Sequence, residues 1–252
     1  MKELRPIPVE NIDKQASEEP LDVTFTAAVW SLLGALMWLL QTRAELSPYI
    51  GYLQRNAKDL RVKHVYAINR LLRFCIRNVS GLHYQHLSGS VKLVCIADAA
   101  YKSIVELTDC IALRGYILAL VGTNDSGVDT YYPGGKLQIL DWLSKKFIVI
   151  TRSSFAAELR NKLLAAQALI FMAGYIHEIS QPVGSALEMA DVLDEGKLIV
   201  PTVLCGDSKG VFEAVQNQSG KCKIDQSLAM HVKALREACD KYQIQEIVWL
   251  DN

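Results

Sequence analysis

The chain lacks three features that each identify a class of protein: net charge, a membrane-length apolar run and paired cysteines. Lysine plus arginine and aspartate plus glutamate both number 27, so the overall charge gives no preference for nucleic acid. The most apolar run, AAVWSLLGALMWLL at residues 27–40, is shorter than the ~20 residues that span a bilayer. We therefore expect a buried helix there and no membrane partner.

The cysteines are scattered, with no CxxC pair and no secretory leader. This pattern is typical of reduced thiols, so we expect a cytoplasmic or nuclear protein. A nucleophilic Cys205 is not expected, because it lies in an apolar stretch and no histidine is placed by sequence to activate it. A nucleotide-binding loop is also missing: VGTNDSG and YPGGK lack the GxxxxGKS/T pattern and are typical of turns.

Charge is unevenly distributed along the balanced chain. Residues 1–22 hold six acids and three bases, whereas residues 55–79 hold seven lysines or arginines and only Asp59 as an acid. The segment VKHVYAINRLLRFCIRN predicts an amphipathic helix with a basic outer face, which is explained equally well by solvation and by contact with phosphates. Its apolar positions are Val65, Ile68, Leu72 and Ile76, and its basic positions are Lys63, Arg70, Arg73 and Arg77.

Composition divides the chain into four parts. A proline- and charge-rich lead-in at 1–23 is expected to be disordered, and a helical segment follows at 24–79. A linker rich in glycine and serine, SGLHYQHLSGS, covers 80–90, and an α/β domain covers 91–252. The linker carries an HxxH pair, but no third ligand is near, so a zinc site is not expected.

The last part alternates between strand and helix patterns. Three strands are expected at VKLVCIAD, RGYILALVG and KLQILDWLSKK, and their short connections favour an antiparallel meander. A long helix from SSFAAEL to about Ile179 follows, then the strand PTVLCGD at 201–207. Two helices, SKGVFEAVQ and SLAMHVKALREACDKY, precede a final strand, EIVWLD. The predicted order is βββαβααβ, an α/β fold with a mixed sheet.

Three acids occupy positions that suggest a metal site. Asp98 interrupts a run that is otherwise typical of a buried strand, where an uncompensated charge is costly. If the strands that carry Asp98 and Asp207 are parallel neighbours, both acids reach one sheet edge, and Glu158 can join them from the long helix. Clustered carboxylates bind hard divalent cations. On spacing alone, simpler roles are favoured: a strand end for Asp98, a first-turn acid for Glu158 and an N-cap for Asp207.

These segments resemble the C-terminal part of copia-type retrotransposon polyproteins. Residues 24–79, with TRAEL at their centre, are similar to the helical tail that follows the family's reverse transcriptase. IADAAYK, DWLSKKFIVITRSSFAAEL and LCGDSKGVFE are similar, in order and spacing, to three segments of its RNase H domain. The likeness covers nearly the whole chain after residue 23.

The resemblance implies an RNase H-like fold: a mixed five-stranded sheet flanked by helices, preceded by a small helical segment. It implies that Asp98, Glu158 and Asp207 are catalytic and hold two Mg²⁺ or Mn²⁺ ions. The expected substrate is the RNA strand of an RNA/DNA hybrid, and the expected protein partner is the remaining reverse transcriptase portion. Candidates for nucleic-acid contact are Lys145, Lys146, Arg152, Arg70, Arg73 and Arg77.

The sequence departs from the family in two ways. No "YxDD" strand is present, so the chain is not expected to copy nucleic acid. The family's fourth acid lies in an "LAD" motif on a helix beyond the last strand, whereas this sequence stops at EIVWLDN, and Asp251 is not expected to replace it. We therefore expect a truncated domain with impaired activity. The alternatives are a catalytically inactive nucleic-acid-binding remnant and a scaffold module that pairs through the apolar helix at 27–40.

Overall fold

The structure is a computed structural model, and it describes residues 4–10, 17–87, 89–101, 112–122, 136–217 and 226–251. The turns expected within 123–135 lie outside these residues, as do Cys110 and Cys222. The chain divides into two compact units, Met1–His83 and Tyr84–Asn252.

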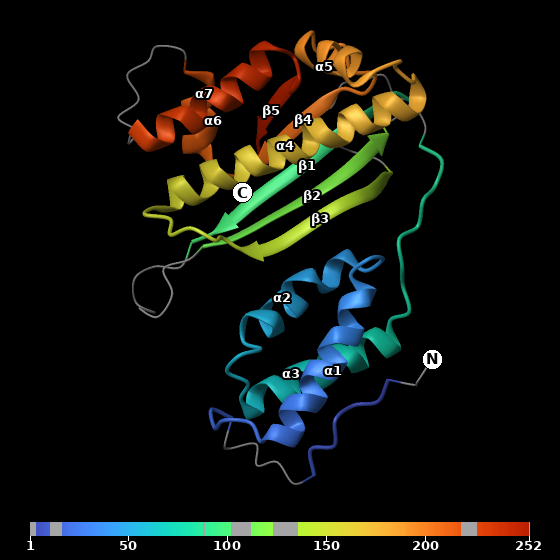
Figure 1. The fold of residues 1–252 in the computed structure, drawn as a ribbon, viewed down its shortest axis with the longest axis vertical. Coiled ribbons are helices and arrows are strands. Elements are labelled where there is room, and N and C mark those ends of the chain that lie inside the picture. The colour runs from blue at the N-terminus through green and yellow to red at the C-terminus, as the bar shows by residue number, and fades with distance from the viewer. Residues whose placement is uncertain are drawn as a thin grey trace. The chain divides into compact units, whose positions relative to one another are not determined.

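The first unit is helical, with α1 at Val23–Leu39, α2 at Ser47–Arg55 and α3 at Val62–Arg77 (Figure 1). Asp22 begins α1, because its side chain accepts a hydrogen bond from the Thr24 N–H at 2.8 Å. A 3₁₀ turn at Ala44–Leu46 leads into α2. Leucine, isoleucine and valine side chains from the three helices form one core cluster.

Two expectations for this unit need correction. The helix at 27–40 is buried on one side only: Val29 and Leu36 are fully buried, whereas Trp38 is 73% exposed. In α3, three of the four predicted core positions are buried, but Ile76 is 55% exposed. Cys75, the neighbouring residue, is buried in its place.

The second unit contains a five-stranded sheet in the order β3-β2-β1-β4-β5 (Figure 1). The strands are β1 Val91–Ala100, β2 Leu113–Gly122, β3 Leu137–Lys146, β4 Thr202–Gly206 and β5 Glu246–Trp249. β1, β2 and β3 are antiparallel, whereas β4 is parallel to both β1 and β5. The predicted mixed five-stranded sheet and the predicted meander are confirmed.

Four helices of the described residues accompany the sheet: α4 Ser154–Ser180, α5 Ala186–Asp194, α6 Lys209–Gln216 and α7 Gln226–Asp240. α4, α6 and α7 share one core cluster with β1, β2 and β4. By length and composition alone α4 is apolar enough to cross a membrane, but it lies along the sheet and supplies core residues such as Leu159 and Leu169. The predicted order omitted α5, a short helix with no fully buried residue, although its Met189, Val192 and Leu193 pack half-buried against the same core cluster.

Candidate metal centre

Three acids from three separate elements meet at one end of the sheet. Asp98 lies on β1, Glu158 lies on α4, and Asp207 directly follows β4. One carboxylate oxygen from each residue lies within 4.8 Å of the other two. β1 and β4 are parallel neighbours, paired from Leu93–Thr202 to Ile96–Cys205, which brings Asp98 and Asp207 to the same edge. The convergence expected from the strand order is therefore present.

Asp98 is not buried in its strand. Ala97 and Ala99 are buried on one face of β1, whereas Ile96, Asp98 and Ala100 alternate with them and are exposed. The expectation that Asp98 must be compensated for desolvation was therefore wrong, because the second half of β1 is buried on one face only. Asp98 also lies two residues before the end of β1, so the simpler role of a strand-end residue does not apply.

Glu158 is the buried member of the group, with 8% of its surface exposed. Ser153 begins α4 by accepting from the Ala156 N–H at 3.1 Å, and Glu158 lies beyond the first turn, so it is not a first-turn acid. Its Oε1 accepts from the Ala99 N–H at 3.0 Å, while its buried Oε2 has no partner. Burial raises the pKa of Glu158 to about 7, against a lowering effect of the Ala99 N–H.

Asp207 is exposed and is not the N-cap of the helix that follows. Ser208 occupies the N-cap position of α6. The Asp207 carbonyl accepts from the Trp249 indole N–H at 3.1 Å, which ties the residue to the end of β5. The carboxylate is thus left facing the other two acids.

The three carboxylates fit a hard divalent cation. All are oxygen donors, and the unpartnered Oε2 of Glu158 is a buried acceptor that a bound cation would satisfy. Mg²⁺ and Mn²⁺ both prefer such ligands. Asp251, which follows β5, is not part of this cluster among the described residues.

Lys162 is a residue of this site that the sequence analysis did not single out. It lies one helical turn after Glu158, is 4% exposed, and donates to the Ala97 carbonyl at 2.5 Å and the Cys205 carbonyl at 3.2 Å. Asn161 beside it donates to the Asp98 carbonyl at 2.7 Å and the Gly115 carbonyl at 2.9 Å. The spacing in ELRNK gives only a partial signal: it places Glu158 and Lys162 on one helix face, because residues i and i+4 are neighbours there, but it does not show that Lys162 is buried.

Basic side chains lie at the same end of the sheet as the acids. Asp98 pairs with Gly115, and Gly115 pairs with Ser144 on β3, which is followed by Lys145 and Lys146. Two strand spacings separate β1 from β3, about 10 Å. Lys145 and Arg152 are exposed, and Lys146 is half-buried. Their role in phosphate contact stays a prediction.

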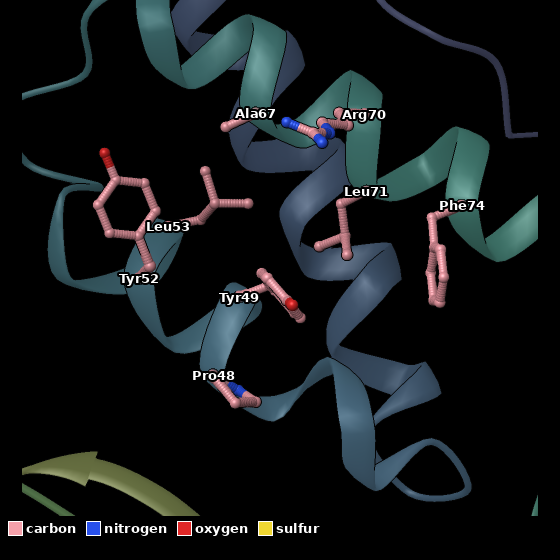
Figure 2. Close-up of a pocket in the computed structure, with 8 residues that line it drawn as sticks. All are labelled: Pro48, Tyr49, Tyr52, Leu53, Ala67, Arg70, Leu71 and Phe74. Carbon is pink, nitrogen blue, oxygen red and sulfur yellow. The ribbon is translucent and has the colours of Figure 1, made fainter.

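The predicted basic face of the first unit borders an aromatic groove. Arg70, Arg73 and Arg77 are exposed on α3. A cavity of about 680 Å³ between α2 and α3 is lined by Tyr49, Tyr52, Phe74, Arg70 and four smaller or apolar residues (Figure 2). A second hollow of about 400 Å³ shares Arg70 and Phe74 with it and adds Arg73 and Arg77.

The described cysteines are free thiols, as expected. Cys95 and Cys205 are buried in the sheet, and burial raises the pKa of Cys205 to about 11. A thiol with so high a pKa is a poor nucleophile, in agreement with the sequence analysis.

Comparison with known proteins gives distant structural likenesses. No family model matches the sequence, and no curated protein matches it. RNase H1 from the archaeon Halobacterium salinarum has a TM-score of 0.37 at 15% identity, over 64% of this chain and 86% of its own.

Two further solved structures are similar at the same level. The N-terminal RNase H domain of a Mycobacterium tuberculosis protein has a TM-score of 0.34 at 16% identity, over 65% of this chain and 84% of its own. LC11-RNase H1 from compost, in complex with an RNA/DNA hybrid, has a TM-score of 0.36 at 12% identity, over 64% of this chain and 85% of its own. At such identities and TM-scores, the function of the chain has to be inferred from its own residues.

Proposed function

We propose that residues 91–252 form an RNase H-like nuclease domain that hydrolyses the RNA strand of RNA/DNA hybrids with divalent metal ions. The observation that carries this proposal is the convergence of Asp98, Glu158 and Asp207 from three elements to within 4.8 Å. The simpler role weighed for each acid does not apply, because none of the three is the strand-end, first-turn or N-cap residue of its element. A shared ligand explains all three at once.

The residues of the chain supply the binding and orientation in this reaction. Two bound Mg²⁺ or Mn²⁺ ions would supply an activated water and stabilise the leaving oxygen. Asp98 and Asp207 present exposed carboxylates to the substrate side, and Glu158 presents its unpartnered Oε2 from the protein side. The hydrogen bonds from Ala99 to Glu158 and from Asn161 to Asp98 fix the spacing between α4 and β1.

The substrate would be held through its phosphates. Lys145, Lys146 and Arg152 lie near the acidic end of the sheet, and Arg70, Arg73 and Arg77 form a basic face in the helical unit. Arginine beside exposed aromatic rings, as around Tyr49 and Phe74, is a composition that also suits stacked bases (Figure 2). Binding should therefore weaken steeply with salt.

We also propose that the chain comes from a retroelement polyprotein. The copia-like segments support an origin in a retroelement polyprotein, acting in the cytoplasm or nucleus, where free thiols persist. α1 is buried on one side only, so Trp38 is exposed to solvent. An exposed apolar surface suits a protein partner, and we propose the remaining reverse transcriptase portion for that role.

The test is cleavage of a hybrid whose RNA strand is fluorescently labelled, in Mg²⁺ or Mn²⁺. We expect wild type to cut the hybrid and not double-stranded DNA, and we expect Asp98→Asn to remove the activity. Asp191→Asn, which neutralises an exposed acid of α5, is the matched control and should cut normally. Cleavage that survives Asp98→Asn would reject the site.

A second candidate is a catalytically inactive nucleic-acid-binding remnant. The observation that favours it is the Lys162 amine, which puts a positive charge into the centre where cations would bind. In that case wild type binds the labelled hybrid in a filter or anisotropy assay but does not cut it in either metal.

A further inference from the structure

Lys162 is a buried basic side chain whose amine lies between the ends of two strands. Only 4% of its surface is exposed, and its amine donates to the carbonyls of Ala97 on β1 and Cys205 on β4. A buried ammonium is costly unless it is paired and hydrogen-bonded. Something in the site must therefore compensate this charge.

The backbone around Lys162 is shaped to accept it. β1 and β4 pair only as far as Ile96 and Cys205, so the Ala97 carbonyl lies beyond the ladder. A β-carbon at the buried Gly206 would lie 1.3 Å from the Lys162 Nζ and 2.7 Å from the Ala97 oxygen. Glycine at 206 thus makes the space that the amine occupies.

The three acids are the groups that compensate the charge. Burial, the largest influence, lowers the pKa of Lys162, and the carboxylates of Glu158, Asp207 and Asp98 oppose this by favouring its charged form. Lys162 in turn favours the charged form of Glu158. Lys162 donates to the carbonyl of Ala97, one residue before Asp98, and to the carbonyl of Cys205, two residues before Asp207.

We propose that Lys162 is a resident cation of the acidic centre, a positioning residue that holds the ends of β1 and β4 together and offsets part of the charge of Glu158, Asp98 and Asp207. The centre is then held together before any metal ion arrives. It also binds divalent cations more weakly than three carboxylates would alone, because like charges repel. Only this second consequence rests on the proposed function.

The first experiment tests the compensation without metal. Thermal unfolding is measured in a chelator for the full chain, Lys162→Met, Glu158→Gln and the double variant. We expect Glu158→Gln to raise the melting temperature more in the Lys162→Met background, where it removes an uncompensated buried carboxylate, than in the wild-type background, where Lys162 offsets part of that charge. Asp191→Asn is the control and should shift both backgrounds equally. An equal shift by Glu158→Gln in both backgrounds would overturn the proposal.

The second experiment measures Mn²⁺ affinity by isothermal titration calorimetry. We expect Lys162→Met to bind Mn²⁺ about tenfold more tightly than wild type, since one nearby positive charge is removed. Lys162→Arg keeps the charge and should not gain affinity. Lys233→Met removes an exposed lysine of α7 and should behave as wild type. Equal or weaker binding by Lys162→Met would contradict the proposed effect on metal affinity.

The two experiments separate this proposal from the proposed function. If no variant binds Mn²⁺ but Glu158→Gln raises the melting temperature more in the Lys162→Met background, the resident cation stands and the metal-dependent nuclease fails. If Mn²⁺ binds equally to wild type and Lys162→Met, and the two backgrounds respond alike, the nuclease stands and the resident cation is rejected.

Discussion

The acidic centre and the basic face of α3 are built in opposite ways. Asp98 lies within β1, Glu158 lies on α4, and Asp207 follows β4. These elements are far apart in the chain, and only the sheet and α4 bring the three acids together. Arg70, Arg73 and Arg77 belong to one helix and share a face by spacing alone. A site of the first kind depends on tertiary packing, whereas a site of the second kind needs only its helix to form.

The two regions also differ in burial: the acidic centre is partly buried, and the basic face is exposed. Glu158 and Lys162 are 8% and 4% exposed, and their polar atoms bond to the backbone of β1. The arginines of α3 are exposed. Substitutions in the acidic centre should therefore change both stability and activity, whereas substitutions on the basic face should change binding alone.

The largest expected effect is on the rate of hybrid cleavage, which should fall far more for a substitution in the acidic centre than for one on the basic face. Glu158→Gln keeps the size of the side chain but removes a charged ligand, and we expect the rate of hybrid cleavage to fall by more than about 100-fold, the upper end of losses seen for outer-shell metal partners. Arg73→Gln should reduce the rate only through binding, by about threefold at low salt. Cleavage rates at subsaturating hybrid, which report kcat/KM, check both values. Similar losses in the two variants would refute the contrast.

A stability effect should follow from crowding at Gly206. Gly206→Ala places a methyl group on the Lys162 amine and the Ala97 carbonyl, so we expect the free energy of unfolding to fall by about 2–3 kcal/mol. Adding Lys162→Met, a flexible side chain without the amine, should recover part of this loss. Urea denaturation measures each variant. Gly210→Ala in α6, where a β-carbon would meet only ordinary contacts with Phe155, is the matched control.

The pH dependence of stability should report on Glu158. Folding raises its pKa from 4.5 to about 7, mainly by burial, so folding favours its protonated form. This stabilisation is complete below about pH 4.5 and is lost as the pH rises through about 7. In a chelator, the free energy of unfolding should fall over that range, and Glu158→Gln should flatten the fall. A fall of the same size in both proteins would exclude Glu158 as its source.

The smallest effect should come from the basic face. Each of Arg70→Gln, Arg73→Gln and Arg77→Gln should weaken hybrid binding about two- to threefold at low salt and reduce the salt slope by about one. The free energy of unfolding should change by less than about 0.5 kcal/mol, because these side chains are exposed. Fluorescence anisotropy against salt concentration checks the slope. An unchanged slope would mean that the arginines form a solvated face only.

Local patterns predicted the elements of the second unit well. The strands at 91–98, 114–122 and 136–146 lie within or almost match β1, β2 and β3, because alternation and turn residues mark strands directly. α5 was missed although Met189, Val192 and Leu193 follow helical spacing and pack against the core, because the helix is short and none of these residues is fully buried. Ile76 was misplaced, because spacing alone does not define which of two adjacent apolar residues faces the core.

The candidate site was predictable only in part. Asp98, Glu158 and Asp207 were found through their order and context, but the reason first given for Asp98 was wrong, since the strand is exposed on that face. Lys162 was not found, because a lysine on a helix is ordinarily solvated, and nothing in ELRNK shows that the β4 ladder ends early enough to free a carbonyl for it.

The sequence by itself determined the strands, most of the helices and the basic face of α3, since each depends on spacing within a short segment. It also pointed to the three acids, through the order and context of the segments that carry them. Only the tertiary structure decided that the acids converge within 4.8 Å, that Glu158 is buried and that Gly206 leaves room for the Lys162 amine. The reason is physical: helix and strand patterns arise from local backbone geometry, whereas burial and charge compensation arise from packing between segments that are distant in the chain.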